Sequence, residues 1–118
     1  MILVDTSVWI AHFRAGHPRL RILLHEESVL THPFVVGELT CGPIGNRDEI
    51  LGLLAALPEA RVAEHREVLA FVDGRRLYGR GIGWVDAHLL ASALLSDCAL
   101  WTLDAKLSRV ASTLNVSL

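Results

Sequence analysis

Short apolar runs that alternate with helical patterns are the feature that most constrains the fold of this chain. The first run, residues 1–4 (MILV), contains β-branched side chains and is short, both of which favour a strand. Similar runs lie at 28–31 and 99–102, and 61–63 is a weaker candidate. Runs without polar alternation are typical of strands buried on both faces, as in a parallel sheet.

Longer segments between these runs carry apolar residues at helical spacing and are predicted to be helices. Strands that alternate with helices predict an α/β fold, in which helices flank both faces of a central parallel sheet. With 118 residues the chain is expected to form one domain, residues 1–118. The predicted helices are 6–14, 19–27, 33–41, 47–57, 64–78, 86–96 and 105–114, and 115–118 is an edge-strand candidate.

Composition excludes several classes of protein. The formal net charge of −2 excludes a globally basic nucleic-acid-binding protein. No apolar run is long enough to cross a bilayer, and the start MILVDTS lacks the basic residues of a signal peptide, so we expect a cytoplasmic protein without membrane contact. Cys41 and Cys98 lie far apart, which favours reduced thiols. The hydrophobic content of 52% suggests apolar surface that a partner or second copy covers.

Three aspartates stand where predicted helices begin. Asp5 and Asp104 each follow an apolar run, and Asp86 follows the glycine-rich segment 79–83. The carboxyl ends of parallel strands meet at one edge of a sheet, where ligands bind, so these side chains are expected to converge. Each aspartate is also a suitable helix N-cap, whose replacement by alanine typically costs about 1 kcal/mol. Capping and ligand binding are compatible roles.

Glu38 is a further candidate. It follows Phe34 by four residues and Val35 by three, so on a helix it shares a face with apolar side chains. A carboxylate on such a face must be paired, neutralised or bound to a cation. A side chain that reaches solvent at the edge of the apolar face is the alternative.

Four neighbouring carboxylates would repel one another, and a hard divalent cation removes that repulsion. Mg²⁺, or Mn²⁺ in its place, prefers oxygen ligands of this kind. Such a site supports hydrolysis of a phosphodiester bond by activated water. The hydroxyls of Ser7 and Thr102 lie two residues from Asp5 and Asp104, where they can support the carboxylates or simply form turn hydrogen bonds.

RNA as a substrate requires basic contacts to its backbone. Arg80, in the glycine-rich segment close to Asp86, is the best candidate, and Arg14 is a second. Trp84 could stack on an unpaired base, although the apolar residues after it favour burial in the core. The six histidines have no metal-ligand spacing and are expected to be structural or exposed.

Four segments in order, DTSVWI, HPFVVGELTCG, GIGWVDAHLLASALL and LWTLDAKL, resemble the PIN-domain ribonucleases, and among these the VapC toxins of VapBC toxin–antitoxin systems. The resemblance runs nearly end to end. It implies that Asp5, Glu38, Asp86 and Asp104 bind Mg²⁺ or Mn²⁺ and cleave RNA to leave a 5′-phosphate and a 3′-hydroxyl. It also implies that Ser7 or Thr102 supports this site. A homodimer and a VapB-type antitoxin partner are further implications.

This chain departs from the family pattern at three positions. Where relatives often carry additional acids, it has Ala11, Ala105 and Lys106. These departures weaken the case for a second metal ion bound firmly without substrate. Two other functions fit less well. A phosphoacceptor receiver domain would place paired acids after the first strand, where Asp5 stands alone. A PIN-like module that binds RNA or a partner without catalysis would not need all four acids.

Overall fold

The predicted parallel sheet forms, with the first strand at its centre. In a computed structural model that describes residues 1–118, β1 (Ile2–Val4) pairs with β2 (Val29–Leu30) on one side and β3 (Ala99–Trp101) on the other. Both pairings are parallel. The order β2-β1-β3 means that the chain crosses back over β1 to reach β3. The carboxyl ends of β1 and β3 therefore border the crevice in which α/β sheets bind ligands.

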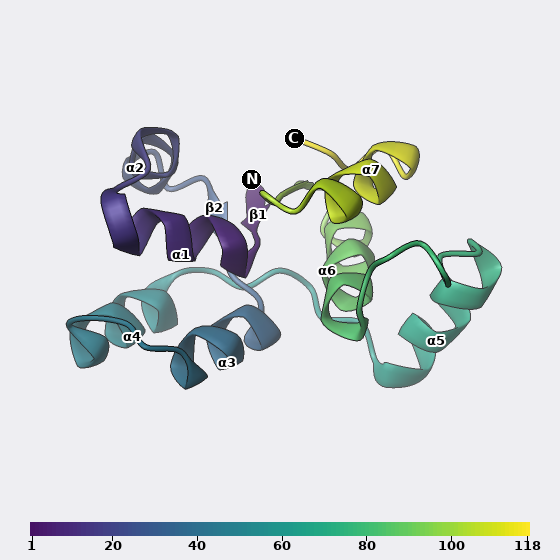
Figure 1. The fold of residues 1–118 in the computed structure, drawn as a ribbon, viewed down its shortest axis with the longest axis horizontal. Helices are drawn as coiled ribbons and strands as arrows, with labels where there is room; N and C mark the ends of the chain where they lie inside the picture. Colours follow the sequence, from purple (N-terminus) through teal and green to yellow (C-terminus); the bar gives the residue numbers. More distant parts are fainter.

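The seven helices are α1 (Thr6–Ala15), α2 (Pro18–His25), α3 (Pro33–Cys41), α4 (Arg47–Ala56), α5 (His65–Gly74), α6 (Trp84–Leu95) and α7 (Ala105–Thr113). In Figure 1, α1 and α2 lie to the left of the strands, α6 and α7 lie to the right, and α3 and α4 lie below. The predicted α/β class is confirmed. Helix α5 packs against α6 through a small cluster that includes Val68 and Ala91. No helix is long and apolar enough to cross a membrane.

Helix α6 is the central helix of the core. Every side chain from Ala87 to Ala93 is buried, which suits a helix that is apolar on nearly all sides. Leu89 and Leu90 belong to the main core together with Leu3 and Leu100 of the strands. Asp86 precedes this buried stretch, so the packing of α6 holds that carboxylate at a defined place beside the sheet.

Four sequence predictions need correction. No strand forms at 61–63, because the chain pairs earlier, through a single bridge between Thr31 and Glu59. The helix predicted for 64–78 ends at Gly74, where Arg76 adopts a φ of 54° and the N–H of Leu77 bonds back to Val72. The helix predicted to begin at residue 86 begins two residues earlier. The predicted edge strand at 115–118 is reduced to one bridge between Leu100 and Ser117.

Candidate functional site

Asp5 lies at the end of β1 and is only 8% exposed. Its Oδ2 atom accepts two hydrogen bonds, from the Ser7 hydroxyl at 2.7 Å and the Thr102 hydroxyl at 2.7 Å. No protein group donates to Oδ1. The two hydroxyl donors fix the orientation of the carboxylate and leave Oδ1 free.

The same two hydroxyls join the end of β1 to the end of β3. The Ser7 Oγ atom accepts from the N–H of Leu103 at 3.0 Å, and the Thr102 Oγ1 atom accepts from the N–H of Asp104 at 3.0 Å. Each hydroxyl thus donates to a carboxylate and accepts from the backbone. The structure places both predicted supporting residues beside Asp5, and it shows that they also position the segment that carries Asp104.

Asp104 is the N-cap of α7, as predicted for an aspartate before a helix. Its Oδ1 atom accepts from the N–H of Leu107 at 2.9 Å. The carboxylate is exposed, and its second oxygen has no protein donor. The cap therefore fixes one oxygen and leaves the other available to a ligand.

Asp86 occupies the third position of α6 instead of the N-cap. Its Oδ2 atom accepts from the N–H of Gly83 at 3.0 Å, which closes the start of the helix. Burial raises the pKa of Asp86, the Gly83 N–H opposes that rise, and the charges of Asp5, Asp104 and Glu38 add to it. The carboxylates of the other three candidates are therefore close enough for their charges to act on Asp86.

Glu38 is exposed on α3, so its side chain reaches solvent at the edge of the apolar face of that helix. Its Oε1 atom accepts from the Thr6 hydroxyl at 2.7 Å. Thr6 follows Asp5 directly and begins α1, which brings α3 to the same edge of the sheet. Thr6 was not among the predicted site residues, although its hydroxyl next to Asp5 was a usable signal.

All four carboxylates share one arrangement. In each, one oxygen is held by a hydroxyl or a backbone N–H, and the other has no protein donor. No arginine or lysine donates to any of them. In residues 1–118, no three acidic, histidine or cysteine side chains lie close enough together to hold one ion. The donor chemistry nevertheless fits a hard cation, because every free ligand atom is a carboxylate oxygen. Ion binding would require the side chains to draw together.

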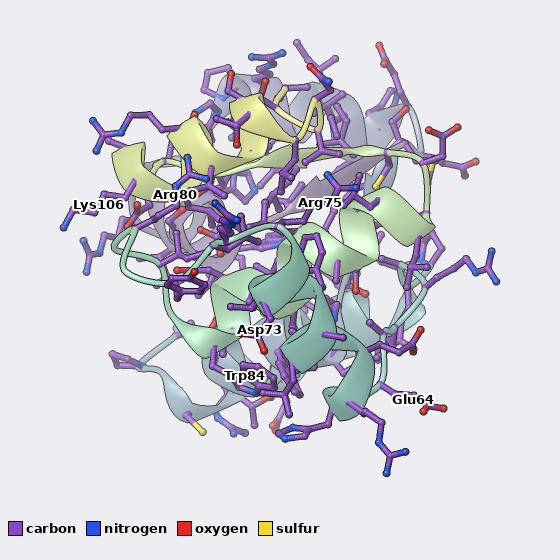
Figure 2. The ribbon with its side chains drawn as sticks, turned by 90° about the vertical axis from the view of Figure 1, so that its right-hand side faces the viewer. Glu64, Asp73, Arg75, Arg80, Trp84 and Lys106 are labelled. Atoms are coloured by element: carbon purple, nitrogen blue, oxygen red, sulfur yellow. The ribbon has the colours of Figure 1, made fainter.

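Two basic side chains lie at the edge of this site. Arg80 is exposed in the loop before α6, and Lys106 is exposed in the first turn of α7. The aliphatic part of Lys106 lies over Gly81, where an added Cβ would come within 2.5 Å of the Lys106 Cδ atom. Figure 2 shows Arg80 and Lys106 on the same side of the molecule. Arg80 was predicted from the sequence to contact RNA, whereas Lys106 was not.

Trp84 is not buried in the core, contrary to expectation. It is 37% exposed at the start of α6 and packs on His88, with ring centroids 4.7 Å apart. Its surface position is visible in Figure 2. His88 is buried, as is His32, whose Nδ1 atom accepts from the N–H of Phe34 at 3.0 Å. Burial lowers the pKa of both histidines, which supports the prediction of a structural role.

Known proteins match this chain over nearly its whole length. The family model described as the PIN domain matches residues 2–112. Two curated relatives, both named Ribonuclease VapC32, come from Mycobacterium tuberculosis strains ATCC 25618 / H37Rv and CDC 1551 / Oshkosh. Each is 50% identical to this chain over 119 aligned residues, which cover 100% of this chain and 96% of the relative. These matches confirm the resemblance inferred from the four sequence motifs.

Proposed function

The chain belongs to the PIN-domain family and is similar throughout to a VapC ribonuclease, and from that membership we propose that it is a Mg²⁺-dependent endoribonuclease toxin of a type II toxin–antitoxin system. Mn²⁺ is expected to substitute for Mg²⁺. The reaction is hydrolysis of an RNA phosphodiester bond, with a 5′-phosphate and a 3′-hydroxyl as the product ends.

The shared arrangement of the four carboxylates is the observation that best supports this proposal. Asp5, Glu38, Asp86 and Asp104 each keep one oxygen free of protein donors at one edge of the sheet. In our proposal these oxygens hold the ion. A bound divalent cation supplies a Lewis acid that activates water and offsets negative charge on phosphoryl oxygens.

The remaining groups position the carboxylates. Ser7 and Thr102 fix the orientation of Asp5 through Oδ2, and Thr6 fixes the orientation of Glu38 through Oε1. The raised pKa of Asp86 reflects burial together with repulsion from the other acids, a cost that a cation at this site would remove. Arg80 and Arg14 are proposed to contact the RNA backbone.

Cleavage of a mixed cellular RNA pool by antitoxin-free protein tests the proposal. Reactions with Mg²⁺, Mn²⁺ or EDTA would be compared for wild type, Asp86→Asn and the matched control Asp73→Asn, an exposed aspartate of α5 whose charge is not among those that raise the pKa of Asp86. We expect discrete fragments with either metal from wild type and Asp73→Asn only. Folded wild-type protein that cleaves no RNA with any metal would favour the other candidate, a PIN-like module without catalysis.

Family membership also leads us to propose a VapB-type antitoxin and a homodimer. An apolar cavity of about 530 Å³ between α1, α2 and α4 supports a protein partner. Leu53 lies in its wall and is 63% exposed, so the apolar lining of the cavity continues onto the surface, where a partner can cover it. Leu53→Asp is expected to weaken inhibition by the cognate antitoxin, whereas Val62→Asp, at an exposed residue outside this cavity, should not. Light scattering after size exclusion tests the homodimer.

A further inference from the structure

A second, smaller cavity of about 150 Å³ lies between α1, α3 and the loop that follows α3. Ile10 and Phe13 of α1 form one wall, and residues 42–45 form another. Arg14 and Glu38 complete the lining, so an exposed cation and a proposed metal ligand border the same space. The larger apolar cavity has no carboxylate in its lining.

This small cavity adjoins the proposed site directly. The Glu38 side chain that lines it is held by Thr6, which is the neighbour of Asp5. A strand of RNA whose phosphodiester bond lies at the four carboxylates therefore has an adjacent nucleotide at the mouth of this cavity. The small volume admits one flat ring system and excludes a duplex, which suits the unpaired bases that proteins read in RNA.

The groups around the cavity match the parts of a nucleotide. Ile10 and Phe13 offer an apolar surface to the face of a base, and the Arg14 guanidinium suits a phosphate. The Gly45 N–H has no hydrogen-bond partner within the protein, so it can donate to a base edge. Arg47 holds the loop in place, because its guanidinium donates to the Thr40 carbonyl at 2.9 Å at the end of α3.

We propose that this cavity is a nucleotide subsite, which accepts one unpaired nucleotide of the RNA next to the cleaved bond and makes cleavage depend on the identity of that base. The subsite rests on the proposed nuclease function for its role in catalysis. Arg14 holds the phosphate of the bound nucleotide, and the loop at 42–45 contacts its base.

Gly45 offers a way to block the cavity without disturbing the fold. A Cβ at this position would meet no atom within 4 Å, and its backbone has no positive φ. Gly45→Leu is therefore expected to fold and to occupy space in the cavity. Gly74, at the end of α5 and equally free of neighbours, is the matched control for a leucine substitution. Arg14→Ala is a second variant, at an exposed side chain that forms no hydrogen bond within the protein, so it is also expected to fold.

The first experiment measures cleavage of single-stranded RNA oligonucleotides in which the base on either side of the cleaved bond is varied. We expect Gly45→Leu and Arg14→Ala to raise KM by about tenfold or more and to reduce the preference for one base, as loss of one stacked base does. The Mn²⁺ concentration that gives half-maximal activity should stay unchanged in both variants. A change in that concentration would show that the substitution had displaced Glu38. Gly74→Leu should match wild type. Unchanged KM and base preference in both variants would overturn the subsite.

A second experiment separates failure of the subsite from failure of the nuclease function. The four ribonucleoside 5′-monophosphates would be titrated into isotopically labelled Asp86→Asn protein and followed by NMR. Shifts at the amides of Gly42, Ile44 and Gly45, absent at positions 42 and 44 of Gly45→Leu, support the subsite even if no RNA is cleaved. No shift with any nucleotide overturns it. If Gly45→Leu instead weakens binding of the cognate antitoxin and leaves RNA cleavage intact, the cavity receives a protein side chain and the proposal is wrong.

Discussion

The Thr102 hydroxyl donates a 2.7 Å hydrogen bond to Oδ2 of Asp5, across 97 positions of sequence. The contact joins the carboxyl ends of two adjacent parallel strands. Because the same hydroxyl accepts from the N–H of Asp104, one side chain sets the positions of two of the proposed metal ligands. Threonine at this place is therefore a structural connection within the site as well as a polar group beside it.

Thr102→Val should reduce cleavage and destabilise the fold, because the Asp5 carboxylate loses a donor and the Asp104 N–H loses its acceptor. A hydrogen bond of this kind contributes about 1 kcal/mol to the free energy of unfolding, and more where a charged group is involved. Thr102→Ser keeps the hydroxyl and should retain most activity. Denaturant unfolding and initial cleavage rates measure both effects, and equal rates for the two variants would contradict the prediction.

Asp86→Asn should be at least as stable as wild type in the absence of metal. Its amide oxygen can still accept from the Gly83 N–H, while the negative charge that is disfavoured by partial burial and by the neighbouring acids is gone. An acid with a raised pKa in the folded state destabilises that state once it ionises, so the comparison belongs at neutral pH. Thermal unfolding in EDTA measures the difference. Added Mn²⁺ should then raise the unfolding temperature of wild type more than that of the variant. If the variant is instead less stable than wild type in EDTA, the prediction is wrong and the negative charge of Asp86 stabilises the fold.

Gly81→Ala and Gly79→Ala provide a matched pair. Both glycines have a positive φ, 81° and 70°, so alanine should lower the free energy of unfolding at each by roughly 1–2 kcal/mol. Only at Gly81 does the new Cβ displace Lys106. If Lys106 contributes to RNA binding, KM should rise in Gly81→Ala and in Lys106→Ala but stay unchanged in Gly79→Ala. If the KM of all three variants equals that of wild type, Lys106 does not contribute to RNA binding.

Stability should fall in acid because of His32. Burial lowers the pKa of His32 from 6.5 to about 4, so the unfolded chain takes up a proton first as the pH falls. The stability that neutral His32 provides is complete above about pH 6.5 and is lost as the pH falls towards about 4, by roughly 2–3 kcal/mol. His32→Asn keeps an acceptor for the Phe34 N–H but cannot titrate there. Its unfolding free energy should vary less over this range than that of wild type or the exposed-site control His25→Asn, and parallel profiles would contradict the assignment.

The main elements of the fold were predictable because their patterns are local. Three short apolar runs became the three strands, and each segment of helical spacing contains a helix. The ends of the elements were less predictable. The helix predicted to extend to Tyr78 stops at Gly74, because the buried Leu77 requires the chain to turn back. The strand expected at 61–63 is absent, since pairing to Thr31 occurs at Glu59 instead.

The candidate acids came from residue type and position at the ends of strands, and the structure brings all four to one edge of the sheet. The side chains that surround these acids could not be predicted from residue type and position. That Thr6 would hold Glu38, that Lys106 would cover Gly81, and that Trp84 would stay partly exposed all depend on how helices pack.

The sequence by itself determined the alternating order of strands and helices, the acids placed where helices begin, and membership of the PIN-domain family, because these features depend on residues close together in the chain or on matching motifs. Only the tertiary structure decided which oxygen of each carboxylate is held and which is free, and that a small cavity adjoins Glu38. Those features arise from contacts between distant segments, whose geometry depends on the packing of the whole core.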